Sequence, residues 1–163
     1  MIGSRASLCC HKVTKWWMNL LRPLYKCQKL TLDEQLKAGV RLFDFTLKLT
    51  KGDKIMCFCQ GLLEFKDSVR KTFYKLNKYK GVYARVQFVV EDELDIPLIK
   101  EYAELLERTY KRVHFLGCYD THGNFIYDFG YSPILEVNKK ASKIAGKINE
   151  LYILANFVDK VYE

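Results

Sequence analysis

Cysteine and histidine are the side chains of this sequence that could bind a metal ion or attack a substrate. Cys57 and Cys59 alternate in an apolar segment, so both thiols would lie on one face of a strand. Cys9, Cys10 and His11 are consecutive. Zinc prefers thiolate and imidazole ligands, but the chain has no Cys-x-x-Cys pair, and buried free thiols are common. We predict no metal and no cofactor, with a zinc site or an opportunistic disulfide as the alternatives.

The other two histidines have no evident catalytic partner in the sequence. His114 lies in an apolar segment typical of a strand, and His122 lies in a turn-forming sequence. We interpret both as structural residues.

The composition predicts one folded domain over residues 1–163. An apolar fraction of 49% with 14% aromatic residues is ample for a core at this length. No apolar run approaches the ~20 residues needed to span a bilayer, and the first residues do not resemble an export signal. Six cysteines without such a signal indicate reduced thiols. We therefore expect cytoplasmic synthesis and no transmembrane segment.

The chain is basic, with a formal charge of +8 and an isoelectric point near 9.1. Such a charge attracts anionic surfaces such as nucleic acid, acidic lipid or an acidic protein. Lysine supplies most of the charge and is spread over expected helix faces, and no specific nucleic-acid motif is present. We interpret the charge as an ordinary solvated surface, with a functional anion-binding surface as the alternative.

Helices and strands are expected to alternate along most of the chain. Thr31 and Glu34 form a capping-box pattern that opens a helix over 31–38, and Gly39 would end it. The segments 40–49 and 54–60 resemble adjacent strands, joined by the hairpin-turn sequence Lys51-Gly52-Asp53. The remaining expected elements are a helix over 65–79, a strand over 83–90, a helix from an Asp95 N-cap to Tyr110, strands over 112–119 and 125–129, and a helix-prone region over 136–163.

This alternation predicts an α/β fold with mainly parallel strands, including those near 40–49, 54–60, 83–90 and 112–118. A closed eight-stranded barrel typically needs ~250 residues, which this chain does not have. We expect a reduced or distorted TIM-type barrel of about six mainly parallel strands with surrounding helices. Periodicity alone leaves an open doubly wound sheet as the alternative.

The stretch from Gln28 to Asp44 reads Q-K-L-T-L-D-E-Q-L-K-A-G-V-R-L-F-D and resembles the X-region of the phosphatidylinositol-specific phospholipase C-like phosphodiesterases. In that family a glutamine precedes a capped helix ending in A-G-V-R and a strand carrying F-D. Residues 2–7 (I-G-S-R-A-S) are similar to the family's G-S-H-N-S or G-T-H-D-S, and residues 59–62 (C-Q-G-L) to its A-H-G-L. The resemblance covers about residues 1–91 and extends to short single-domain versions in bacteria and their phages.

The resemblance implies that the catalytic residues are lost. In the family, the histidine of the first motif is the general base and the histidine before glycine is the general acid; Arg5 and Gln60 stand there instead. Arginine stays protonated and glutamine does not titrate, so neither can exchange protons at neutral pH. Ala6 replaces the family's aspartate or asparagine and Thr46 its phosphate-stabilising arginine, while Asp44 is retained. We expect a pseudoenzyme.

Arg85 and Glu91 also match family positions, so the resemblance implies a vestigial ligand pocket together with Arg5, Asp44 and Gln60. We expect Asp44 and Gln60 to lie at strand ends and to face one cavity. Arg85 and Glu91 could pair with Arg5 or Asp44 as a buried polar cluster, which is the interpretation we favour. We expect Arg5 to lie against Asp44 or Glu91 or to project outwards. The leading hypothesis is a structural or protein-interaction module, a bacteriophage protein incorporated into the particle or another larger assembly. The alternatives are a module that binds an anionic, phosphorylated ligand, and a residual phosphoric diester hydrolase.

The resemblance places Trp16 and Trp17 in a short, lid-like helix, and Pro23 suggests an irregular connection after it. We expect both tryptophans to pack against the barrel. An interfacial membrane wedge is the alternative, because aromatic residues beside basic ones can lie at a bilayer surface.

Overall fold

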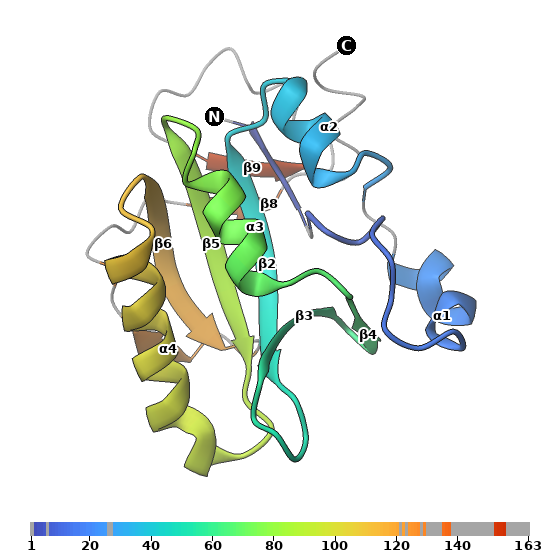
Figure 1. Ribbon diagram of the computed structural model, residues 1–163, viewed down its shortest axis with the longest axis vertical. Helices are drawn as coiled ribbons and strands as arrows, with labels where there is room; N and C mark the ends of the chain where they lie inside the picture. Colours follow the sequence, from blue (N-terminus) through green and yellow to red (C-terminus); the bar gives the residue numbers. More distant parts are fainter. Residues whose placement is uncertain are drawn as a thin grey trace.

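The computed structural model describes residues 2–5, 7–25, 28–120, 122, 124–127, 129, 135–137 and 152–155. These residues form one mixed sheet of nine strands, with helices α3 and α4 on one of its faces (Figure 1). The strands are β1 (Ile2–Ser4), β2 (Leu42–Leu49), β3 (Met56–Gln60), β4 (Leu63–Glu64), β5 (Val82–Val89), β6 (Val113–Asp120), β7 (Phe125–Tyr127), β8 (Leu135–Val137) and β9 (Tyr152–Ala155). The helices are α1 (Met18–Tyr25), α2 (Leu32–Lys37), α3 (Val69–Leu76) and α4 (Ile96–Thr109), with a 3₁₀ turn, η1 (Glu93–Asp95), before α4.

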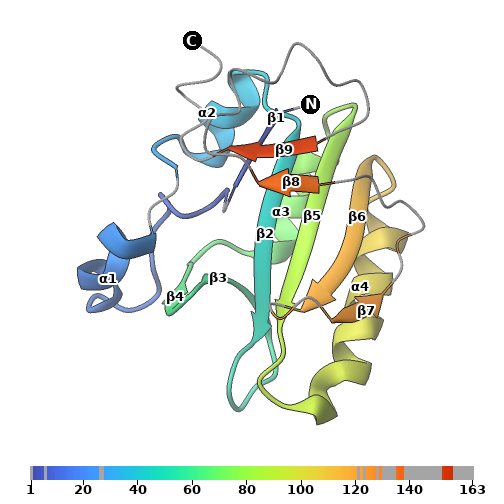
Figure 2. The same cartoon turned by 180° about the vertical axis from the view of Figure 1, so that it is seen from behind.

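The strand order is β7-β6-β5-β2-β1-β9-β8, with β3 and β4 branching from β2. Neighbours from β6 to β8 along this path are parallel, and β8 and β9 lie on the side of β2 and β5 away from α3 (Figure 2). Among the described strands, β7 and β8 form the two ends of the path and do not pair with each other, so the barrel is not closed. The expectation of a mixed α/β fold is confirmed, although the described sheet has nine strands where about six were expected.

The segment expected as a parallel strand over 54–60 is instead the antiparallel partner of β2. Thr46 is opposite Cys59, and Leu49 is opposite Met56. Gly52 in the intervening turn has a φ of +94°, which glycine adopts without strain. The expected hairpin is therefore confirmed, and the expected parallel direction is wrong because a hairpin reverses the chain.

The capping box at the start of α2 is confirmed. The Thr31 side chain accepts a hydrogen bond from the Glu34 amide, and the Glu34 carboxylate accepts one from the Thr31 amide at 2.7 Å. Gln35 of α2 is buried, and its side-chain amide donates to the carbonyls of Ser7 and Leu30. Helix α2 thereby holds the loop that follows β1.

The helix expected over 65–79 is shorter than its apolar period suggested. Phe65 forms an isolated antiparallel bridge with Val13, so the chain is still extended at this residue. Ser68 then caps α3 by accepting a hydrogen bond from the Lys71 amide.

Asp95 does not have the capping role expected of it. Asp92 caps η1, so the backbone at Asp95 is already helical and its side chain caps no helix amide. The Asp95 carboxylate instead accepts hydrogen bonds from the Lys54 ammonium group at 2.7 and 2.8 Å.

The last third of the chain differs most from expectation. The strand expected over 125–129 is β7, and the strands β8 and β9 lie in the region 136–163 that was expected to be helical. The rest of that region lies outside the described residues. Strand pairing over long sequence separations overrides local helix propensity here.

Strand β2 separates the core from a polar face. Phe43, Phe45 and Leu47 are buried in the core beneath the helices, where the rings of Phe45 and Phe73 lie 5.4 Å apart. Successive strand residues point to opposite faces. The alternate residues of β2 therefore form what we call the polar face: Asp44, Thr46 and Lys48.

Candidate functional site

The polar face centres on an ion pair between two neighbouring strands. Asp44 of β2 and Arg85 of β5 are opposite each other in the parallel register, and the Arg85 guanidinium donates a hydrogen bond to the Asp44 carboxylate at 2.9 Å. The Asp44 side chain is 7% exposed and that of Arg85 is 21% exposed. Such a shielded pair is costly to break, because either partner left alone is a charge with little access to water.

The loop after β1 is fixed to the same point of β2. The Ser7 amide donates to the Asp44 carbonyl, and the Ser7 hydroxyl accepts from the Asp44 amide, both at 2.9 Å. The same hydroxyl donates to the carbonyl of Ser4 at 2.9 Å. Buried Gln28 adds a bond from its side-chain amide to the Arg5 carbonyl at 2.9 Å. These hydrogen bonds hold the segment carrying Arg5 beside Asp44.

A small cavity lies between β2 and β3 beside this ion pair. Its volume is about 10 Å³, and Asp44, Thr46 and Gln60 line it with Cys59 and the Phe58 ring. This space holds about one water molecule. Three of the residue positions singled out in the sequence therefore meet at one cavity, although Asp44 lies within β2 and not at its end.

Lys48, the third residue of the polar face, forms a second ion pair. The Lys48 ammonium group lies 2.6 Å from the Glu64 carboxylate, with the two side chains 17% and 22% exposed. The Lys48 hydrogen bond holds the pKa of Glu64 below its ordinary value. Burial by itself would lower the pKa of Lys48, but the hydrogen bond and charge of Glu64 outweigh it, so that this pKa is raised.

The two alternating cysteines of β3 lie opposite residues of the polar face. Cys59 pairs with Thr46 and Cys57 with Lys48 in the antiparallel register. Burial raises the pKa of Cys59 to about 12 and also raises the pKa of Cys57. A thiol that resists ionisation is a poor nucleophile and a poor metal ligand. Within the described part of the chain, no three His, Cys, Asp or Glu side chains gather closely enough to hold a metal ion.

The remaining positions singled out in the sequence are separated from the cavity or fall outside the described residues. Glu91 lies beyond the end of β5, and its carboxylate is 3.5 Å from the ammonium group of Lys51. Arg5 is half-buried, and among the described residues Asp44 pairs with Arg85 and Glu91 with Lys51, not with Arg5. The expected pairing of Arg5 with Asp44 or Glu91 is not found. Ala6 lies outside the described residues.

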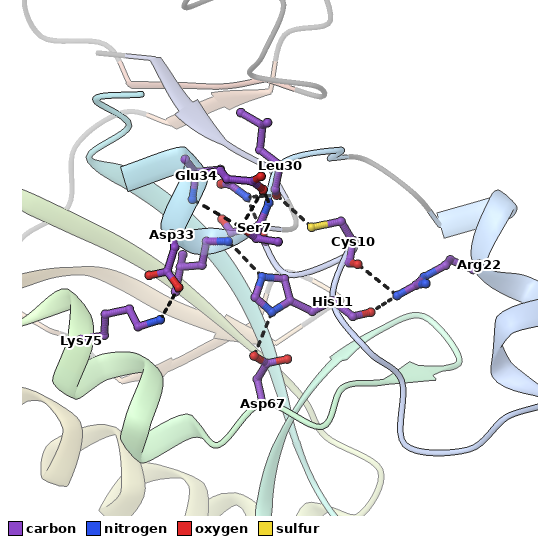
Figure 3. Close-up of polar contacts among 12 residues, drawn as sticks. Ser7, Cys10, His11, Arg22, Leu30, Asp33, Glu34, Asp67 and Lys75 are labelled. Atoms are coloured by element: carbon purple, nitrogen blue, oxygen red, sulfur yellow. Dashed lines mark hydrogen bonds and ion pairs between the residues drawn. The ribbon is translucent and has the colours of Figure 1, made fainter. Parts of the chain in front are cut away.

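His11, considered in the sequence only as a possible zinc ligand beside Cys9 and Cys10, connects three segments of the fold. His11 accepts a hydrogen bond from the Leu32 amide at Nε2, 3.0 Å away, so Nδ1 carries the proton and donates to Asp67 at 2.8 Å (Figure 3). The Arg22 guanidinium donates to the carbonyls of Cys10 and His11. Both imidazole nitrogens are therefore occupied, and His11 joins the loop after β1 to α2 and to the segment before α3.

The expected burial of the two tryptophans is wrong. Trp16 is 79% exposed and Trp17 is 41% exposed, and both precede α1, which continues through Pro23. Only Met18 is a buried residue of this helix in the described structure. No helix in the described ranges is long and apolar enough to cross a membrane.

Comparison with known proteins finds a likeness in fold. No protein-family model and no curated protein sequence matches the chain. Among solved structures, the phosphatidylinositol-specific phospholipase C from Listeria monocytogenes is similar, with a TM-score of 0.58 and 17% sequence identity. The likeness covers 94% of this chain and 71% of that enzyme. The chain therefore has a phospholipase C-like fold, in keeping with the resemblance found in its sequence.

Proposed function

We propose that this protein is a non-catalytic domain with a phospholipase C-like fold that acts as a structural or protein-interaction module. The observation that carries the proposal is the Asp44–Arg85 ion pair beside a cavity of about 10 Å³. Binding sites for small molecules typically enclose ~300–1,000 Å³. A cavity that holds one water has no room for an inositol phosphate between β2 and β3.

The residues at the positions of the family's acid and base are also not suited to proton transfer. General acid–base catalysis needs side chains that titrate near neutral pH within hydrogen-bond reach of the substrate. Gln60 lines the cavity but does not titrate, and Arg5, on the neighbouring loop, stays protonated. His11 lies elsewhere, with both nitrogens hydrogen-bonded. The chemistry that the resemblance would supply therefore has no evident acid or base.

The alternative of a phosphate-binding module is less well supported. Phosphate recognition needs a cation that is free to accept an anion in a planar fork or as a point charge. Arg85 and Lys48, the cations of the polar face, each have a carboxylate partner at 2.9 and 2.6 Å. Ion pairs of this kind stabilise the fold. The resemblance to short phage proteins extends the proposal to a role within an assembled particle.

An activity assay tests the proposal. We expect no hydrolysis of phosphatidylinositol or of a glycerophosphodiester, with or without calcium, under conditions where an active phospholipase C of known specificity turns over both. Gln60→Ala and Arg5→Ala serve as matched controls. Reproducible turnover that either substitution abolishes would overturn the proposal. Saturable binding of inositol phosphate that Arg85→Met abolishes would favour the ligand-binding alternative instead.

A further inference from the structure

An apolar stripe lies exposed on α1 and on the residues just before it. Trp16, Leu20 and Leu24 are 79%, 75% and 77% exposed. A spacing of four residues places helical side chains on one face, so Leu20 and Leu24 are neighbours, with Trp16 just ahead of them. This is a large amount of apolar surface for one short helix, and contiguous exposed apolar surface commonly marks an interaction site.

The surroundings of this stripe are basic. The first 32 residues contain six lysines and arginines and no aspartate or glutamate. Lys15, which directly precedes Trp16, and Lys12, four residues before Trp16, are exposed. We call the exposed side chains Trp16, Leu20 and Leu24, with these two lysines, the α1 face.

A second apolar stripe lies on α4 and η1. Leu94, Leu98 and Leu105 are 85%, 40% and 49% exposed. Leu98 and Leu105 flank half-buried Tyr102 in a groove of about 310 Å³, large enough to admit an apolar side chain of a partner. The opposite side of the helix buries Ile99, Ala103 and Leu106 in the core, so the exposed leucines are not needed for folding.

The surroundings of this second stripe are acidic. Residues 91–107 contain seven aspartates and glutamates and one lysine, in a chain whose net charge is +8. Glu101, Glu104 and Arg108 line the groove itself, and the Arg108 guanidinium lies 3.6 Å from the Glu104 carboxylate, so the groove keeps one carboxylate in excess. We call Leu94, Leu98 and Leu105, with these two glutamates, the α4 face.

The two faces match in chemistry and lie on opposite flanks of the molecule. Helix α1 lies beside β4, and α4 lies beside β6 and β7 at the other end of the sheet (Figures 1 and 2). One face is apolar and basic, and the other is apolar and acidic. Because they are far apart, the α1 face cannot cover the α4 face of its own chain.

We propose that the α1 face of one copy of this chain docks on the α4 face of a second copy. Such a contact joins two different patches, so it is heterologous, and copies add head to tail into an open chain or a ring. The proposal rests on the proposed function as an interaction module and names its partner as the protein itself. Opposite charges on the two faces orient the contact and favour it over contacts between like faces.

Two variants of the full chain separate this arrangement from others. Leu20→Ser/Leu24→Ser removes the apolar stripe of the α1 face, and Leu98→Ser/Leu105→Ser removes that of the α4 face. All four leucines are exposed by 40% or more, so both variants should fold. Tyr74→Ser, which changes a 61% exposed residue on α3, is the matched control.

Sedimentation velocity and light scattering give the readout. The unmodified chain and Tyr74→Ser should show an average mass that rises with concentration and falls at high salt, which screens the charges. Each paired variant alone should stay at the single-chain mass of 19.2 kDa. An equimolar mixture of the two should stop at twice that mass, because one intact α1 face meets one intact α4 face.

Other outcomes would overturn the proposal. A monomeric unmodified chain at all concentrations, or association that survives in the α1 variant, rules out the head-to-tail contact. So does a chain that stays monomeric but binds vesicles of anionic lipid through the α1 face. Hydrolysis of phosphatidylinositol by a chain that still assembles would refute the proposed lack of catalysis alone.

Discussion

The Arg85 guanidinium donates to the Asp44 carboxylate at 2.9 Å across the neighbouring strands β2 and β5. Breaking such a shielded pair leaves one charge stranded, which typically costs 3–5 kcal/mol, whereas replacing both charges with apolar groups is often neutral. We predict that Asp44→Ala lowers the free energy of unfolding by about 3 kcal/mol. The double variant Asp44→Leu/Arg85→Met should recover most of that loss.

Urea denaturation measures both effects. Arg5→Met is the matched control, since it removes a half-buried arginine outside this pair and should cost about 1 kcal/mol or less. If the double variant loses as much free energy of unfolding as the two single variants together, the ion pair does not stabilise the fold as we infer.

The Lys48–Glu64 pair predicts a pH-dependent contribution to stability. The Lys48 hydrogen bond depresses the pKa of Glu64 below 4.5, so the folded state binds this proton less readily than the unfolded state. The contribution is therefore complete above about pH 4.5 and is lost as the pH falls through the lower folded value.

We predict that Glu64→Gln lowers the melting temperature at pH 7 by about 3 °C, for a loss on the order of 1 kcal/mol. The difference from the unmodified chain should shrink below pH 4. Asp33→Asn, which breaks the more exposed pair with Lys75, should have little effect at either pH. An equal effect of Glu64→Gln at pH 3 and pH 7 would contradict the prediction.

The buried thiol of Cys59 should be chemically inert in the folded chain. Its pKa of about 12, against an ordinary 9.0, leaves roughly a thousandfold less thiolate near pH 8. We predict that iodoacetamide labels Cys59 at least tenfold more slowly in the native chain than in urea, as read by peptide mass spectrometry. Labelling at the same rate in both states would show that this strand opens readily.

His11 should contribute to stability through its two hydrogen bonds. His11→Phe leaves the Leu32 amide and the Asp67 carboxylate without these partners, which should cost about 2 kcal/mol and lower the melting temperature by about 6 °C. His122→Ala changes an exposed histidine in a turn and is the control. Equal melting temperatures for the two variants would argue against a structural role for His11.

Local signals in the sequence predicted the elements that depend on local chemistry. The Thr31–Glu34 capping box is present in α2, and the apolar segments that predicted strands became β2, β5 and β6. The turn sequence at Gly52 also predicted the hairpin, and a hairpin requires β3 to run antiparallel to β2, as it does.

What the sequence did not reveal depends on pairing over long distances. Asp44 and Arg85 are 41 residues apart, and their pairing was one of several that the sequence left open. The register of β2 against β5 makes these two residues partners. The exposure of Trp16 could not be predicted from the local sequence either. An aromatic residue in an expected helix is usually buried, and only the three-dimensional arrangement shows that Trp16 is 79% exposed.

The position of β1 has a consequence for how the protein is made. β1 lies between β2 and β9, and Ile2 is opposite Ile153, almost the whole chain away. A strand pair of such separation closes a long loop, which slows folding. During synthesis, β2, β5 and β6 can assemble with their helices before β9, the second neighbour of β1, has been made. The end of the sheet formed by β1, β9 and β8 is therefore completed last, when residues 152–155 have left the ribosome.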